Sequence, residues 1–251
     1  MQVAVVTGAS SGIGAALARE LAARGWLCVL LARREERLRA LSEELRAEYE
    51  VCDVSDRAAV ESTAALVLDR HPAVKLLVNS AGISARADFI DGDPERIEEV
   101  MQTNYLGSLW CVRAFLPGLE GGRPADLVNI VSVAGTVAFP PSGPYSASKH
   151  AQLAFSRAVS ASVRSRGVNV HTVNPGFVET EGFPQRAVLR SPFFRRAVLD
   201  PEDVARHIVG LIGEPPSETT IPRWYRIPAV LQALAPNLVA RLVARRQNMY
   251  R

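Results

Sequence analysis

Lysine, cysteine and long apolar runs are scarce in this sequence. Its 251 residues contain three cysteines, Cys28, Cys52 and Cys111, without the spacing of metal ligands. We therefore expect buried, reduced thiols. No apolar run reaches the ~20 residues of a membrane-spanning helix, and no signal peptide precedes the first apolar segment. These absences predict a cytoplasmic protein.

Excess charge is small as well. The formal net charge is +3, and the basic residues are dispersed except near the C-terminus, so the composition gives no support to nucleic-acid binding. No internal repeat, low-complexity tract or linker divides the chain. The length suits one α/β domain with a large core, and we expect a single domain over residues 1–251.

One of the two lysines follows a tyrosine at helical spacing. Among 29 cationic residues only Lys75 and Lys149 are lysines. Tyr145 and Lys149 are four residues apart and share one helix face, and Ser132 lies thirteen residues before the tyrosine. A phenol has an ordinary pKa of about 10, and a fixed ammonium beside it favours the phenolate and proton transfer. The alternative is that Tyr145 and Lys149 lie on a solvent-exposed helix face and have no catalytic role.

The N-terminus predicts a strand, a glycine-rich turn and a helix. The apolar run at 2–7 leads into Gly8-Ala-Ser-Ser-Gly12-Ile-Gly14. This arrangement places backbone N–H groups and the positive end of a helix against a pyrophosphate. The alternative is a plain turn before a capped helix.

The same turn also matches Gly-x-Ser-x-Gly, the nucleophile elbow of serine hydrolases, with Ser10 as the nucleophile. An elbow serine needs an oxyanion loop from an earlier strand, and none precedes residue 2. No evident acidic partner accompanies His150, His171 or His207. We therefore disfavour the hydrolase.

Strand-like runs alternate with helical stretches along the chain. The runs lie at about 2–7, 27–31, 49–53, 74–79, 126–132 and 168–174. This alternation predicts an α/β fold of the Rossmann type, a doubly wound parallel sheet with helices on both faces. Ligands bind such sheets at the carboxyl ends of the strands.

The end of the second strand bears on the choice of dinucleotide. An acidic residue there would accept hydrogen bonds from a ribose 2′-hydroxyl, but Ala32 is followed by Arg33 and Arg34. Guanidinium groups suit a 2′-phosphate, which favours NADP(H), with NAD(H) as the alternative. The two arginines would otherwise only begin an exposed helix and pair with Glu35 and Glu36.

These motifs resemble the short-chain dehydrogenase/reductase family from Val3 to about Gly213. Asn79-Ser-Ala-Gly82 is similar to the Asn-Asn-Ala-Gly signature that steadies the central sheet of the family, with Ser80 in place of the second asparagine. The resemblance implies a catalytic tetrad of Asn104, Ser132, Tyr145 and Lys149.

The resemblance also implies a cofactor site. Asp53 resembles the aspartate that contacts the adenine ring, and Val178 and Thr180 lie in a loop similar to the one that holds the nicotinamide amide. The implied cofactor-binding residues are Gly8, Ser10, Ser11, Gly12, Ile13, Gly14, Arg33, Arg34, Asp53, Val54, Asn79, Ala81, Gly82, Tyr145, Lys149, Pro175, Gly176, Val178 and Thr180.

The activity implied is hydride transfer between nicotinamide and a carbonyl or secondary alcohol, with reduction as the working direction. Tyr145 would protonate the developing alkoxide, and Ser132 would hydrogen-bond it. Lys149 would bind the nicotinamide ribose and lower the pKa of Tyr145, while Asn104 would position a relay water. A dinucleotide-binding sensor or scaffold without turnover is the alternative.

Residues at about 180–200 occupy the usual place of a substrate lid. They are apolar with several cations, which favours a hydrophobic substrate, with or without an acidic group; together with the resemblance this predicts a ketone or aldehyde. A helical hairpin that buries Phe193 and Phe194 in its own core is the alternative. Residues 139–142, just before Tyr145, are expected at the mouth of the pocket.

The C-terminal tail, about 226–251, departs from the family pattern. Its leucines fall near helical spacing, interrupted by Pro236, and its end is rich in arginine. We expect the tail to pack on its own or a partner subunit, with contact to a membrane surface as the alternative. A homodimer through the helices that carry Asn104 and Tyr145 is expected by resemblance, whereas a tetramer is in doubt.

Overall fold

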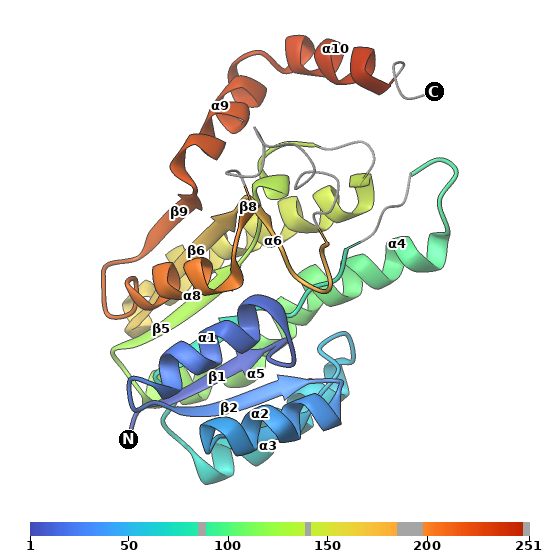
Figure 1. Cartoon of the computed structure of the whole chain (residues 1–251). Coiled ribbons are helices and arrows are strands. Elements are labelled where there is room, and N and C mark those ends of the chain that lie inside the picture. Colours follow the sequence, from blue (N-terminus) through green and yellow to red (C-terminus); the bar gives the residue numbers. More distant parts are fainter. Residues whose placement is uncertain (85–88, 139–141, 185–197, 248–251) are drawn as a thin grey trace.

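A computed structural model describes residues 1–84, 89–138, 142–184 and 198–247, with side chains up to residue 241 (Figure 1). Its main sheet has seven parallel strands in the order β3-β2-β1-β4-β5-β6-β9, which confirms the predicted doubly wound sheet. The strands are β1 (Val3–Thr7), β2 (Leu27–Ala32), β3 (Glu48–Val51), β4 (Leu76–Asn79), β5 (Ala125–Ile130), β6 (Val168–Pro175) and β9 (Ser217–Ile221).

The seventh strand, β9, was not predicted. Its sequence, Ser-Glu-Thr-Thr-Ile, is polar and only partly buried because β9 is an edge strand. An edge strand lacks the continuous apolar run that marks strands buried on both faces.

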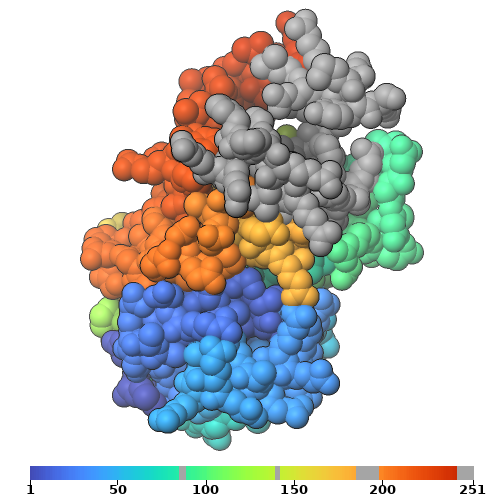
Figure 2. Space-filling view, in the orientation of Figure 1, coloured from blue at the N-terminus to red at the C-terminus, as the bar shows by residue number. Residues whose placement is uncertain are grey.

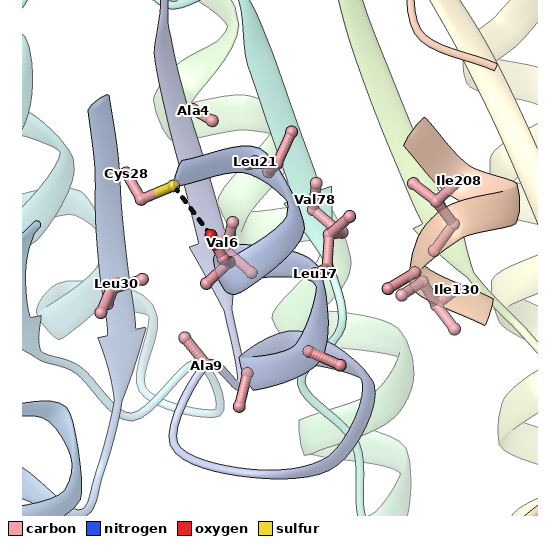
Figure 3. Packing of buried hydrophobic residues seen from close by; sticks show 14 of the residues in the cluster. Ala4, Val6, Ala9, Leu17, Leu21, Cys28, Leu30, Val78, Ile130 and Ile208 are labelled. Atoms are coloured by element: carbon pink, nitrogen blue, oxygen red, sulfur yellow. Dashed lines mark hydrogen bonds between the residues drawn. The ribbon is translucent and has the colours of Figure 1, made fainter. Parts of the chain in front are cut away.

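Helices cover both faces of the sheet. Strand β1 shows why: Ala4 and Val6 point into one core, and Val3 and Val5 point into the other. The first core is covered by α1 (Gly12–Ala22), α2 (Glu35–Leu45) and α8 (Pro201–Val209), and the second by α3 (Arg57–Arg70), α5 (Gly107–Gly121) and α6 (Gly143–Val163). Figure 3 shows the first core, where Leu17 and Leu21 of α1 lie between β1 and Ile208 of α8.

The remaining elements position the site. Helix α4 (Pro94–Met101) continues through a π-helical turn, Gln102–Leu106, into α5. A small parallel pair, β7 (Phe177–Val178) and β8 (Val198–Leu199), joins the two ends of the expected lid. Residues 185–197, which include Phe193 and Phe194, and residues 139–141 lie outside the described part of the chain.

The C-terminal tail forms α9 (Arg226–Leu234) and α10 (Pro236–Gln247), separated at Pro236 as the sequence indicated. Both helices lie beyond β6 and β9, on the side of the molecule away from the N-terminal strands β1 and β2 (Figures 1 and 2). No residue of α9 is buried, so its leucines do not join a core in the part of the chain that the structure describes. The side chain of Leu242 lies outside the described part.

One of the three histidines named in the sequence analysis, His171, has an acidic partner that the sequence did not reveal. His171 of β6 is buried, its Nε2 is 3.1 Å from Oδ1 of Asp126, and its Nδ1 is 3.0 Å from Oγ of Ser217. Oδ2 of Asp126 accepts a hydrogen bond of 3.0 Å from Gly213 N. Asp126 and Ser217 lie at the amino ends of β5 and β9, remote from the glycine turn, so this cluster fastens β9 to the sheet and forms no hydrolase site with Ser10.

Asp126→Ala should destabilise the protein by about 1–3 kcal/mol, because it leaves the buried Nε2 of His171 without an acceptor and removes the hydrogen bond from Gly213 N. Urea unfolding measures the change. Glu44→Ala is the matched control, since it removes an exposed carboxylate paired with Arg19 at 2.7 Å and should cost less than about 1 kcal/mol. Equal losses in the two variants would contradict the structural role given to Asp126.

Candidate active site

The glycine turn is closed by backbone contacts that admit no side chain. Gly8 has a φ of 65°, and a Cβ there would lie 2.8 Å from the backbone of Ala81. A Cβ on Gly14 would lie 2.5 Å from the carbonyl oxygen of Gly8. The turn therefore folds against the start of α1 and against the loop after β4, with the helix N-terminus at the carboxyl end of β1.

A cavity of about 380 Å³ opens beside this turn. It lies at the carboxyl ends of β1 to β4, where the strand order reverses between β1 and β4, the usual ligand position in such sheets. The predicted residues that line it are Gly8, Ser10, Ser11, Gly12, Ile13, Arg33, Arg34, Asp53, Val54, Ala81, Gly82 and Thr180.

Other predicted cofactor residues lie outside the lining of this cavity. Gly14 is packed on Gly8, Asn79 is buried between β4 and β5, and Gly176 is covered by the ring of Tyr225. Pro175 and Val178 are buried in β6 and β7. The sequence analysis missed several lining residues, namely Ala32, Cys52, Ser80, Ile83, Thr103, Glu181, Gly182 and Phe183.

Arg34 and the serine turn form one cluster on the cavity wall. The Arg34 guanidinium donates to Oγ of Ser10 at 3.0 and 3.1 Å and to Oγ of Ser11 at 2.6 Å. Ser11 stands at the N-cap of α1, but its side chain does not cap the helix. Arg34 also pairs with Glu181 at 3.4 Å, so its acidic partner comes from a distant loop and not from Glu35 or Glu36.

Arg33 lines the same wall of the cavity, next to Asp53. Its Nη1 is 3.5 Å from Oδ2 of Asp53. Burial acts against the Asp53 carboxylate, but hydrogen bonds from Ser55 and the charge of Arg33 outweigh it and hold the pKa of Asp53 below its usual value. The wall therefore combines two guanidinium groups, two hydroxyls and an ionised carboxylate.

The catalytic candidates meet next to the inner end of the cavity. Ser132 follows β5, and its side chain hydrogen-bonds the hydroxyl of Tyr145 on α6. The ring of Phe183 lies 5.3 Å from the ring of Tyr145, between centroids, and Phe183 also lines the cavity. A small group that occupies the Phe183 end of the cavity would therefore lie close to the tyrosine.

Lys149 lies one turn after Tyr145 and is buried. Its Nζ is 5.9 Å from the centroid of the Tyr145 ring, and it donates to the carbonyl oxygen of Ile130 at 3.0 Å and to Oε1 of Gln152 at 2.7 Å. Burial lowers the pKa of Lys149 to about 7.

The pKa of Tyr145 corrects an expectation from the sequence. Burial raises it to about 12, and the hydrogen bond with Ser132 only partly offsets this effect. We had expected Lys149 to lower this pKa. The direction is reversed because loss of solvent disfavours the phenolate and the lysine amine is directed at Ile130 and Gln152.

Asn104 joins a residue that lines the cavity to helix α6. It lies in the π-helical turn, where Oδ1 accepts from Ile83 N at 2.8 Å and Nδ2 donates to Oγ of Ser148 at 2.9 Å. Gly82 lies between this side chain and Lys149. The predicted relay water remains a prediction.

Gln152 is a functional candidate that the sequence analysis missed. It is buried, accepts from Lys149, and donates from Nε2 to Oγ of Ser108 at 2.8 Å. Ser108 in turn donates to the carbonyl oxygen of Asn104 at 3.0 Å. Helical spacing from Lys149 was the only available signal, because no motif marks a glutamine at this position.

Unpaired polar atoms also point to a ligand in the cavity. The buried Oγ1 of Thr103 has no hydrogen-bond partner among the described residues, and Thr103 lines the cavity. Buried polar groups are normally satisfied by protein, water or ligand. Together with the glycine turn and the cationic wall, this orphaned hydroxyl fits a bound dinucleotide.

Comparisons with known proteins agree with this geometry. The family model described as short chain dehydrogenase matches residues 2–187. Dehydrogenase/reductase SDR family member 7B of Bos taurus is 33% identical over 99% of this chain and 82% of its own length. Farnesol dehydrogenase of Aedes aegypti is 35% identical over 86% of this chain and 91% of its own length.

Two solved structures are similar as well. An alcohol dehydrogenase from Thermococcus sibiricus, complexed with 5-hydroxy-NADP, has a TM-score of 0.79 and 28% identity over 90% of this chain and 97% of its own. A single-substitution variant of actinorhodin polyketide ketoreductase with NADPH has a TM-score of 0.79 and 30% identity over 88% of this chain and 95% of its own.

Replacing Lys149 by methionine should change how stability depends on pH in the cofactor-free protein. The pKa of Lys149 falls from 10.5 in the unfolded chain to about 7 on folding. Between these values the unfolded state holds more protons, so this lysine makes stability rise with pH, by at most about 1.4 kcal/mol per pH unit.

Urea unfolding between pH 7 and 10 should therefore show a shallower rise for Lys149→Met than for the wild type. Lys75→Met removes the other lysine from an exposed position and should leave the profile unchanged. Identical slopes for the wild type and Lys149→Met would refute the assignment of this titration to Lys149.

Proposed function

Because the chain belongs to the short-chain dehydrogenase family, we propose that it is an NADP(H)-dependent reductase of ketones or aldehydes with hydrophobic substituents. The observation that carries the proposal is the hydrogen bond between the Tyr145 and Ser132 side chains beside buried Lys149. This group adjoins the end of a cavity suited to a dinucleotide.

When bound, the nicotinamide supplies a hydride to the substrate carbonyl carbon. Tyr145 donates its hydroxyl proton to the carbonyl oxygen, and Ser132 donates a hydrogen bond to the same oxygen as negative charge develops there. Protonated Lys149 stabilises the tyrosinate that remains and binds the nicotinamide ribose. A proton returned to Tyr145 closes the cycle.

The state of Tyr145 favours the reducing direction. A phenol whose pKa is raised to about 12 by burial keeps its proton at neutral pH. A general acid must begin in its protonated form, so the resting side chain is ready to protonate an alkoxide. Oxidation would need the phenolate, which burial disfavours.

Support for NADP(H) comes from the cavity wall. Arg33, Arg34, Ser10 and Ser11 would hold a 2′-phosphate, because guanidinium and hydroxyl groups are strong phosphate donors. Asp53 would lie against the adenine. The bound NADP analogue and NADPH in the two similar structures support the same preference.

A hydrophobic substrate is supported by Phe183, whose ring packs beside Tyr145. The relatives named farnesol dehydrogenase and polyketide ketoreductase act, by their names, on an apolar alcohol and on ketones. Their names favour a bulky carbonyl compound over a small polar one.

Tyr145→Phe should lower kcat with the best carbonyl substrate by at least about 100-fold, since proton transfer by a positioned side chain contributes 10²–10⁴-fold. NADPH oxidation against a panel of aldehydes, ketones and oxoacyl thioesters measures this change. Tyr105→Phe is the control, because Tyr105 packs on Phe155 away from the cavity and should keep normal turnover.

Near-normal turnover of Tyr145→Phe would remove the tyrosine from the mechanism. A wild-type protein that binds NADPH tightly but turns over no member of the panel would instead support the sensor. These two outcomes separate a wrong residue assignment from a wrong function.

Arg34→Gln should reduce kcat/KM for NADPH by about tenfold or more and leave kcat/KM for NADH nearly unchanged, because only NADPH carries the 2′-phosphate. Arg37→Gln is a matched control. Arg37 also pairs with Glu181, at 3.0 Å, but does not line the cavity. Equal losses with both cofactors would show that Arg34 supports the fold of the turn and not cofactor choice.

A further inference from the structure

The two C-terminal helices expose an apolar stripe. Ile227, Val230, Leu231 and Leu234 of α9 recur at helical spacing, and Leu238 of α10 follows in the same series. Their exposed fractions are 60, 52, 49, 79 and 54%. Trp224, just before α9, is 50% exposed.

In the helices that cover the sheet, by contrast, the apolar side chains are buried. Leu17 and Leu21 of α1 and Ile208 of α8 are fully buried against the sheet. A helix that turns its apolar stripe outward loses the burial that normally holds a helix in place. The stripe on α9 and α10 therefore points to a surface outside this chain.

Charge changes abruptly at the same point of the sequence. All 26 acidic residues precede Thr219, so residues 1–218 carry 26 acidic and 23 cationic residues, a net charge of −3. The last 33 residues contain no acid, and their six cations are Arg223, Arg226, Arg241, Arg245, Arg246 and Arg251. Arg223, Arg226 and Arg241 form no ion pair with any residue in the described part of the chain.

The start of the tail is fixed firmly to the body. Tyr225 is buried, and its ring covers Gly176. The same ring contacts the ring of Phe177 edge-on, with 6.0 Å between the ring centroids. Gly176 and Phe177 follow β6 at the carboxyl edge of the sheet. The exposed stripe therefore begins at the same edge as the candidate active site.

We propose that α9 and α10 dock this protein on the surface of a membrane that contains anionic phospholipid. Exposed aliphatic side chains at helical spacing, with an exposed tryptophan before them and arginines but no acids in the same segment, are features of helices that lie in the membrane interface. Each arginine near an anionic surface adds attraction. None of the described helices is long and apolar enough to cross a bilayer, so the contact is peripheral.

A second copy of the chain is the competing occupant. Its body is only weakly acidic, at −3 over 218 residues, and protein interfaces exclude unpaired charge from their centres. A bilayer accepts both the aliphatic stripe and the arginines without specific partners. The proposal does not depend on the reductase activity, and binding to vesicles is measured without substrate.

The test is co-sedimentation of the full chain with vesicles. Wild-type protein should bind vesicles made of equal parts phosphatidylglycerol and phosphatidylcholine at least about tenfold more tightly than pure phosphatidylcholine vesicles, and high salt should weaken that binding. Leu231→Asp with Leu234→Asp should abolish binding, and Arg223→Gln with Arg226→Gln should reduce it by about tenfold or more.

Leu66→Asp is the control, because Leu66 is an exposed leucine of α3, 57% exposed, outside the tail. It should bind vesicles like the wild type. Circular dichroism of every variant shows whether the fold is intact.

Failure of the wild type to bind anionic vesicles would overturn the proposal. An equal loss of vesicle binding in Leu66→Asp and in the Leu231→Asp, Leu234→Asp variant would also overturn it. A dimer that dissociates in the Leu231→Asp, Leu234→Asp variant, without vesicle binding by the wild type, would assign the stripe to a second copy.

Discussion

The buried amine of Lys149 is the group on which the site depends. Taking an ammonium out of water is costly, and here the Ile130 carbonyl and Gln152 Oε1 stand in for the lost hydration. They do so incompletely, since burial still lowers the pKa of Lys149 to about 7. Beside a phenol whose pKa is about 12, the charge of this amine would stabilise the phenolate more than the neutral phenol.

This amine is tied to the sheet by a buried polar network. Gln152 and Ser108 connect Lys149 to Asn104 on the π-helical turn. A second chain runs from Asn79 of β4 to Asn129 of β5, at 2.8 Å, and on to Ser156 of α6, at 2.9 Å. Buried hydrogen-bond networks restrict the arrangement of a core, because each misplaced member leaves further polar groups unpaired. Helix α6 is thereby held in register with the strands that form the cavity.

The sequence predicted those features that short-range patterns encode. The glycine turn, the buried strands and the Tyr145–Lys149 spacing follow from local sterics and helical periodicity. It did not predict β9, whose polar edge lacks an apolar run, or the partner of His171, which lies on another strand. The direction of the Tyr145 pKa was also wrong, because burial depends on Phe183 and the surrounding core. Spacing along a helix shows which groups are neighbours but not how much water surrounds them.

Glu181 connects the cationic wall of the cavity to the segment that follows β7. It lies just beyond β7, at the start of the segment that β7 and β8 hold together, and it pairs with Arg34 and Arg37. Arg34 also contacts both serines of the turn. The five N–H donors of the Arg34 guanidinium are thus shared between the hydroxyls of the turn and the Glu181 carboxylate. Arg37 also donates to the Glu181 carboxylate, at 3.0 Å, so Glu181 has a second cationic partner that does not line the cavity.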